Sequence, residues 1–146
     1  IVTATDISQA ALDVASGNVS KHCLDGRINL CQSDVLDHPD LSGSWDIIVS
    51  NPPYIREDEF DGLPADVRPY EPRNALVGGV TGCDIVQRLV QQASGSLTSG
   101  GWIFIEVGPS TVSAAEKIIS DTTELVGAPT VKDSAGLPRI VQARAV

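Results

Sequence analysis

Short apolar runs alternate with amphipathic stretches along this chain, and the alternation predicts its secondary structure. In the first third, runs rich in β-branched residues predict strands at residues 1–5 and 45–50, and alternation of polar and apolar residues predicts a strand at 27–32. Between the first two strands, Ser8 is placed to cap a helix over residues 9–23. Because strand and helix alternate, we expect an α/β fold with a mostly parallel sheet.

The last third continues this alternation and then closes with two strands. Apolar residues recur at helical spacing after residue 84, and the next strong strand begins at Trp102. The predicted elements are a helix at 84–97, a turn at 99–101, a strand at 102–107, a helix capped by Ser110 and ending near 121, and strands at 130–133 and 139–143. The closing pair resembles a hairpin, so one strand should run antiparallel to its neighbours.

Residues 56–82 separate these two regions and show little periodicity. The segment is rich in proline, glycine and acidic residues. A loop of this length inside a compact domain is uncommon and is usually functional. We therefore expect residues 56–82 to form a loop on the substrate side of a site.

Asn51-Pro52-Pro53-Tyr54 follows the third predicted strand directly. In α/β sheets, ligands bind at the carboxyl ends of strands, and two consecutive prolines make a stiff turn there. The Asn51 side-chain oxygen and the Pro52 carbonyl could accept both N–H groups of an NH₂ group, while the Tyr54 ring packs on its flat face. Such a turn would orient a weak amide or aromatic amine nucleophile through positioning. An ordinary strand-exit turn is the alternative.

Two acidic residues stand just past the first two predicted strands. Asp6 occupies the place where nucleotide-binding α/β folds hold ribose hydroxyls, and Asp34 could accept a hydrogen bond from an adenine amino group. Either residue could instead be a structural cap, since Asp is common at such positions. Taken with the turn at Asn51, the two acids predict a nucleoside-bearing cofactor beside an amine-positioning turn.

The amino-acid composition of the chain disfavours several classes of binding partner. The formal net charge is −9 and no block of Lys or Arg occurs, which disfavours binding to nucleic acid. No run approaches the ~18 apolar residues of a membrane span, so no membrane partner is expected. Cys23, Cys31 and Cys83 lack the spacing of metal ligands, and we predict reduced thiols and no metal.

These features together resemble the release factor glutamine methyltransferases, the PrmC or HemK family of class I S-adenosylmethionine-dependent methyltransferases. The matching segments are residues 48–55, Tyr70-Glu71-Pro72, Ala75-Leu76 with Gly78-Gly79, residues 106–109, and Asp133 with Gly136 and Arg139. Asn-Pro-Pro-Tyr alone is shared with methyltransferases that act on adenine, so the other segments make the resemblance specific. It implies one methyltransferase domain over residues 1–146, with a Rossmann-like, mostly parallel sheet and an antiparallel C-terminal strand.

The resemblance also implies a cofactor, a partner and roles for individual residues. S-adenosylmethionine would be the methyl donor and S-adenosylhomocysteine a product. The partner would be a peptide chain release factor, whose Gly-Gly-Gln loop would carry N5-methylglutamine. The implied catalytic residues are Asn51, Pro52, Pro53 and Tyr54; the implied cofactor-binding residues are Asp6, Ile7, Asp34, Val35 and Asn51; the implied substrate-binding residues are Asn51, Pro52, Tyr54, Tyr70, Glu71 and Pro72. We expect a monomer in the cytoplasm, or in mitochondria if the source is eukaryotic.

The chain departs from the family in three places. The family often has Asp-Gly-Leu where this chain has Thr81-Gly82-Cys83-Asp84, and Gln where this chain has Thr111. The glycine-rich loop that follows the family's first strand has no counterpart, and the chain begins in what should be the second strand. We therefore expect a fragment that lacks the first strand and the N-terminal domain, and that is inactive and unstable alone.

Two other functions compete with glutamine methylation. An adenine N6-methyltransferase acting on DNA or RNA would use the same turn, although the net charge and the Tyr-Glu-Pro segment disfavour it. A non-catalytic binding module with a methyltransferase-like fold would fit the lack of a glycine-rich loop. The intact Asn51-Pro52-Pro53-Tyr54 turn disfavours the second alternative.

Overall fold

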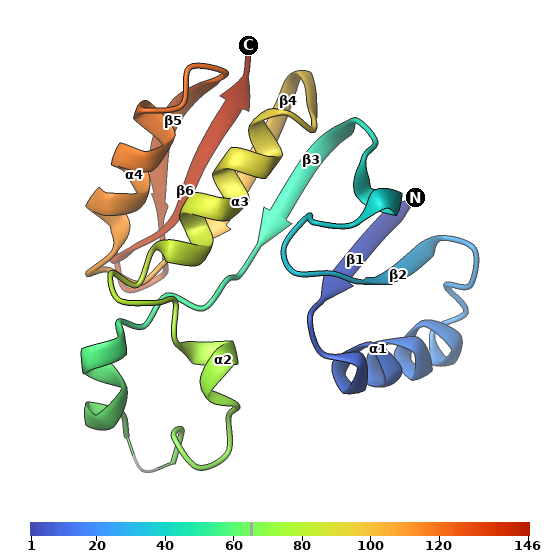
Figure 1. Cartoon of the computed structure of the whole chain (residues 1–146), viewed down its shortest axis with the longest axis horizontal. Helices are drawn as coiled ribbons and strands as arrows, with labels where there is room; N and C mark the ends of the chain where they lie inside the picture. The colour runs from blue at the N-terminus through green and yellow to red at the C-terminus, as the bar shows by residue number, and fades with distance from the viewer. Residues whose placement is uncertain (65) are drawn as a thin grey trace. The chain divides into compact units, whose positions relative to one another are not determined.

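The computed structural model describes residues 1–64 and 66–146, which divide into two compact units, Ile1–Gly43 and Ser44–Val146. In the first unit, β1 (Val2–Asp6) and β2 (Ile28–Gln32) pair in parallel, and α1 (Gln9–Lys21) connects them (Figure 1). This is the βαβ pattern that the sequence predicts. A short 3₁₀ turn, η1 (Pro39–Leu41), follows.

Ser8 is the N-cap of α1, as the sequence predicts. Its backbone is extended, and its hydroxyl oxygen accepts a hydrogen bond from the Ala11 N–H at 3.3 Å. This bond satisfies one of the N–H groups that the first turn of a helix leaves without a helical partner. The helix ends at Lys21, two residues before the predicted limit.

The second unit is built on a four-stranded sheet in the order β3-β4-β6-β5. Its strands are β3 (Trp45–Ser50), β4 (Leu97–Glu106), β5 (Leu125–Lys132) and β6 (Pro138–Ala145). The β3–β4 pair is parallel, whereas β6 runs antiparallel to both β4 and β5. The predicted closing hairpin and its antiparallel strand are therefore confirmed.

Two helices, α3 (Asp84–Ser94) and α4 (Val112–Ser120), lie together on one side of this sheet (Figure 1). Alternate residues of β4, Ile103 and Ile105, are fully buried in the core. The matching helix positions of α3 are Val86, Leu89, Val90 and Ala93, all buried as their spacing predicts. The core therefore lies between the sheet and these helices.

Several predicted boundaries in this unit are wrong. The helix predicted over 84–97 ends at Ser94, and β4 already begins at Leu97. Leu97 pairs with Trp45 and Trp102 pairs with Ile47, so the residues predicted as a turn bulge out of a continuing strand. The N-cap of α4 is Thr111 rather than Ser110. Ser110 belongs to the turn before the helix, which is closed by a hydrogen bond from the Thr111 N–H to the Gly108 carbonyl.

The described residues of the segment 56–82 form more regular structure than their composition suggests. They contain a 3₁₀ segment, η2 (Glu57–Gly62), and a one-turn helix, α2 (Arg73–Leu76). The two ends of the segment meet at an isolated parallel bridge between Ile55 and Val77. The segment is therefore a closed loop that leaves and returns at the carboxyl end of β3.

Candidate active site

The Asn51-Pro52-Pro53-Tyr54 turn lies directly after β3, where the sequence predicts it. Asn51 is exposed, Pro52 is buried, and Pro53 and Tyr54 are half-buried. A buried proline anchors the turn while the neighbouring amide side chain faces solvent. This combination leaves Asn51 accessible to an incoming group on a rigid backbone.

Backbone hydrogen bonds tie the loop of residues 56–82 to the chain just after this turn. The Ile55 N–H donates to the Leu76 carbonyl at 2.9 Å, and the Gly78 N–H donates to the Ile55 carbonyl at 2.9 Å. The Glu57 N–H donates to the Gly79 carbonyl at 3.0 Å. Both ends of the loop are thus held next to Tyr54.

Two glycines allow the returning chain to approach the turn. The backbone of Gly78 packs so closely on the Pro53 and Gly82 carbonyl oxygens that no side chain fits. At Gly82, whose φ is +75°, an added Cβ would lie 2.7 Å from the Tyr54 carbonyl oxygen. The turn is therefore packed against glycine backbone on its loop side.

Asp84, the first residue of α3, fixes the end of the loop. Its carboxylate accepts the Val80 N–H at 3.0 Å and the Thr81 hydroxyl at 2.5 Å. The Thr81 oxygen in turn accepts the Cys83 N–H at 3.1 Å. The Cys83 thiol is buried, and this burial raises its pKa, with the Asp84 charge adding to the effect.

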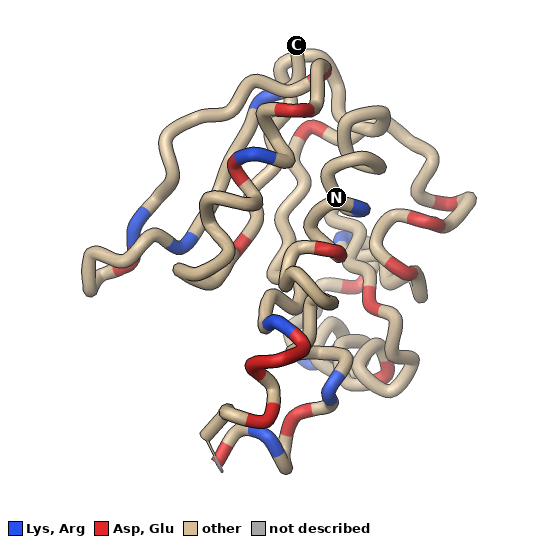
Figure 2. The backbone as a smooth tube through the Cα atoms, turned by 60° about the vertical axis from the view of Figure 1, so that its left-hand side comes forward, with Lys and Arg blue, Asp and Glu red and all other residues tan. Residues whose placement is uncertain are grey.

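Residues of both charges follow one another along the rest of the loop (Figure 2), and three ion pairs form among them. The ion pairs are Arg56 with Asp58 at 2.9 Å, Arg68 with Asp61 at 3.4 Å, and Arg73 with Glu57 at 2.8 Å. The hydrogen bond from Arg56 lowers the pKa of Asp58, and the same bond raises the pKa of Arg56. The Arg73 guanidinium also lies 5.3 Å from the centroid of the Phe60 ring. These contacts join η2 to α2.

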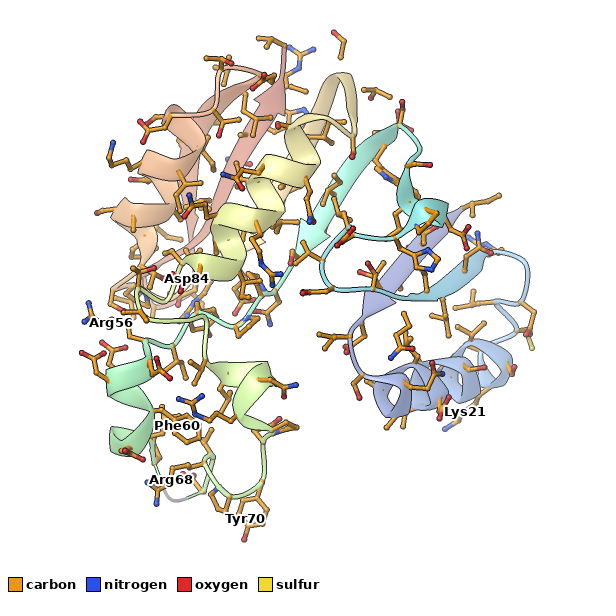
Figure 3. The ribbon with its side chains drawn as sticks, viewed as in Figure 1. Lys21, Arg56, Phe60, Arg68, Tyr70 and Asp84 are labelled. Atoms are coloured by element: carbon orange, nitrogen blue, oxygen red, sulfur yellow. The ribbon has the colours of Figure 1, made fainter. Side chains whose placement is uncertain are left out.

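Tyr70-Glu71-Pro72, predicted to bind substrate, lies on the far part of this loop and is exposed. Tyr70 is 80% exposed and points outward from the ribbon (Figure 3). A large aromatic side chain in this position is available for contact with another molecule. Its role as a substrate contact stays a prediction.

The predicted cofactor-binding residues of the first unit lie at the carboxyl ends of β1 and β2. Asp6 and Asp34 are exposed, as is Ile7. One carboxylate oxygen of Asp6 accepts the Ser8 N–H at 2.8 Å, so Asp6 also helps to start α1. Val35 has a φ of +60°, a left-handed conformation that is strained for a β-branched residue and is often found at functional sites.

Ser33 was not predicted as a site residue. It directly precedes Asp34 in the sequence, and it is buried. Among the residues that the structure describes, its hydroxyl is the buried side-chain polar atom without a hydrogen-bond partner. A buried unpaired hydroxyl is costly and calls for an explanation. The sequence gives no signal for it, because serine at a strand end is usually exposed.

The supporting glycines and Asp84 were also not predicted as site residues. Their contacts join residues 53–57 to residues 76–84, and only the folded loop brings these together. Across residues 1–64 and 66–146 no cluster of His, Cys, Asp and Glu could hold a metal ion. In the same residues no helix has the length and apolar character needed to cross a membrane.

Known proteins resemble this chain in both sequence and structure. A family model for the methyltransferase small domain matches residues 1–63. The release factor glutamine methyltransferase of Rhodopirellula baltica is 39% identical over 140 residues, covering 96% of this chain and 47% of that protein. The ribosomal protein uL3 glutamine methyltransferase of Francisella tularensis is 39% identical over 116 residues, covering 79% of this chain and 36% of that protein.

Solved structures share the fold. TrmN from Thermus thermophilus superposes with a TM-score of 0.68 at 15% identity, covering 99% of this chain and 36% of that one. A methyltransferase named SMU.776, complexed with SAH, superposes with a TM-score of 0.60 at 18% identity, covering 98% of this chain and 38% of that one. The predicted α/β fold is confirmed, and it is the fold of these methyltransferases. The chain spans about half the length of the release factor glutamine methyltransferases it matches.

Proposed function

Because this chain is a homologue of the glutamine methyltransferases over nearly its whole length, we propose that it is the catalytic part of a protein-glutamine N5-methyltransferase. The observation that carries the proposal is the Asn51-Pro52-Pro53-Tyr54 turn at the carboxyl end of β3, with Asn51 exposed on a backbone anchored by buried Pro52. The loop of residues 56–82 closes beside this turn. A substrate held at Asn51 would therefore also meet that loop.

Asn51 and Pro52 bind and orient the substrate in this proposal. A glutamine amide nitrogen is a poor nucleophile, because its lone pair is delocalised into the carbonyl. The Asn51 side-chain oxygen and the Pro52 carbonyl accept its two N–H groups and favour a pyramidal nitrogen with a directed lone pair. The Tyr54 ring packs on the flat amide and excludes water. The turn thus works by positioning and electrostatics, with no strong base.

The residues at the ends of β1 and β2 fit a nucleoside-bearing cofactor. Asp6 is an exposed carboxylate at a strand end, the buried Ser33 hydroxyl is unpaired within the described residues, and Val35 holds a strained backbone. In the proposal Asp6 holds the ribose, and Asp34 and Val35 lie at the adenine, with Ile7 beside them. S-adenosylmethionine, when bound, supplies an electrophilic methyl group.

The substrate in this proposal is the glutamine of the Gly-Gly-Gln loop of a peptide chain release factor. A glutamine of ribosomal protein uL3 is the second candidate, because the Francisella tularensis relative is named for that protein. The adenine alternative is not favoured, since these relatives are named for glutamine methylation. Tyr70, Glu71 and Pro72 are available on the loop to contact the partner protein.

Methyl transfer from labelled S-adenosylmethionine tests the proposal in the protein that carries this chain. The acceptors are a release factor, the same factor with its loop glutamine changed to alanine, ribosomal protein uL3, and duplex DNA. Label on the intact release factor alone is expected; label on uL3 alone would move the assignment to the second candidate. Label on DNA, or on none of the acceptors, would overturn the proposal.

The Asn51→Ala variant tests the mechanism separately. We expect methylation to fall by about 10²–10³-fold, the usual cost of removing one preorganised hydrogen-bonding group from an active site. Binding of the release factor should persist, because Asn51 is one exposed side chain of a larger contact. Unchanged turnover would show that Asn51 does not hold the amide.

A further inference from the structure

The Tyr54 ring lies directly on the backbone of Gly108, which follows the carboxyl end of β4. Gly108 is buried, and a Cβ added to it would lie 3.0 Å from Cδ2 and 3.3 Å from Cε2 of Tyr54. These separations are shorter than ordinary van der Waals contacts of about 3.5–4.0 Å between carbon atoms. The ring would have to shift by a few tenths of an ångström if residue 108 had a side chain.

The backbone conformation of Gly108 does not by itself require glycine. The φ of Gly108 is not positive, unlike that of Gly82 or Gly100. An alanine could therefore adopt this φ without the strain of the left-handed region. The ring of Tyr54 is what an added methyl group would meet first.

Thr111 fixes Gly108 against this ring. The Gly108 carbonyl accepts both the Thr111 hydroxyl and the Thr111 N–H, each at 2.9 Å. Thr111 is 2% exposed, and its methyl group packs beside Gly82, whose backbone lies against the Tyr54 carbonyl. Tyr54 is thus held at its ring by Gly108 and at its main chain by Gly82, with Thr111 contacting both glycines.

We infer that Gly108 is a positioning residue that sets the ring of Tyr54 and thereby the wall of the pocket for the substrate amide. Gly108 acts through Tyr54 and does not itself touch the substrate. This inference rests on the proposed function for its consequence in catalysis. The contact between Gly108 and Tyr54 does not depend on the proposed function. The contact and its effect on catalysis can therefore be tested separately.

The first test follows the ring directly. In the protein that carries this chain, ring-labelled tyrosine gives NMR signals, and Tyr54→Phe and Tyr70→Phe variants identify the signals of Tyr54 and of the exposed Tyr70 among them. In Gly108→Ala the Tyr54 signal should move, while the Tyr70 signal stays in place. The control is Gly127→Ala, where an added Cβ would lie an ordinary 3.5 Å from an Ile119 methyl group and should move neither signal. An unmoved Tyr54 signal in Gly108→Ala would overturn the inference, whatever the enzyme methylates.

The second test is a double-mutant cycle of Gly108→Ala and Tyr54→Ala. With the glutamine substrate, Gly108→Ala should lower kcat by about tenfold or more through misplacement of the ring, with cofactor affinity unchanged. In the Tyr54→Ala background the same change should cost nothing further. Equal losses in both backgrounds, or a moved ring signal with unchanged kcat, would refute a positioning role. A wild-type protein that leaves glutamine unmethylated would defeat the proposed function, not the contact.

The same double-mutant cycle still tests the contact if the Gly108→Ala protein does not fold. The clash disappears when the ring is removed, so Tyr54→Ala should restore folding to the double variant. Melting of the two variants by circular dichroism measures this. A double variant as unstable as Gly108→Ala alone would show that the ring is not what excludes the side chain.

Discussion

Gly78 lies so close to the main-chain oxygen of Pro53 that no side chain fits between them. The contact joins the end of the loop of residues 56–82 to the middle of the Asn-Pro-Pro-Tyr turn. It makes the position of the turn depend on residues about 25 positions later in the chain. The loop therefore supports the turn.

Gly78→Ala should force the loop and the turn apart. Overpacking of this kind costs about 1–3 kcal/mol, and we expect a lower melting temperature and at least a tenfold loss of glutamine methylation. Gly62→Ala is the matched control in the same loop, because no atom lies within 4 Å of a Cβ added there. Equal activity in the two variants would show that the Pro53 contact does not position the turn.

Asp84→Ala should free the end of the loop. The variant loses the acceptor for the Val80 N–H and the Thr81 hydroxyl, and a favourable negative charge at the start of α3. Each hydrogen bond contributes about 0.5–1.5 kcal/mol, and we expect faster hydrogen exchange at the Val80 amide. Thr81→Val, which removes only the hydroxyl, should leave the Val80 amide protected. Unchanged exchange in Asp84→Ala would contradict the arrangement.

Arg73→Ala should loosen the middle of the loop. Arg73 bonds to Glu57 and lies over the Phe60 ring, so its removal separates α2 from η2. The ion pair is exposed and Phe60 is half-buried, and together the two contacts contribute about 1 kcal/mol. We expect faster cleavage within residues 56–82 in limited proteolysis, and an intermediate rate for Arg73→Lys, because lysine lacks the planar guanidinium. If the wild type, Arg73→Ala and Arg73→Lys were cleaved at equal rates, contacts other than those of Arg73 would hold the loop.

Asp133 should make stability depend on pH. Its carboxylate accepts the Leu137 N–H at 3.0 Å, the Ala135 N–H at 2.9 Å and an Arg139 N–H at 3.3 Å, and these bonds lower its pKa. The folded state thus releases this proton more readily than the unfolded state. The stabilisation is complete above the unfolded carboxyl pKa of about 4, and is lost as the pH falls through the lower folded value.

Melting temperatures of the wild type and Asp133→Asn between neutral and acid pH measure this effect. The variant should be less stable at neutral pH, and the difference should narrow as the pH falls. Asp121→Asn, which breaks only an exposed pair with Lys117, is the control and should show a small difference throughout. If the difference in melting temperature between the wild type and Asp133→Asn stayed constant with pH, this would contradict the lowered pKa of Asp133.

Local sequence signals predicted the elements that carry the turn. The apolar run at residues 45–50 gave β3, and the consecutive prolines marked where it ends. The order inside residues 56–82 was missed because η2 and α2 are too short for a helical period, and are held by ion pairs such as Arg73–Glu57. The contact of Gly108 with Tyr54 joins residues more than 50 positions apart, which no local pattern encodes.

The position of β6 has a consequence for synthesis on the ribosome. β6 lies between β4 and β5, so residues 138–145 form one of the two interior strands of the four-stranded sheet. Val141 and Ala143 contribute buried side chains from this strand. While the nascent chain ends short of these residues, β4 and β5 have no partner to join them, and their edges are open to pairing with other chains. The second unit can therefore complete its fold only once residues 138–145 have been synthesised, long after the Asn-Pro-Pro-Tyr turn.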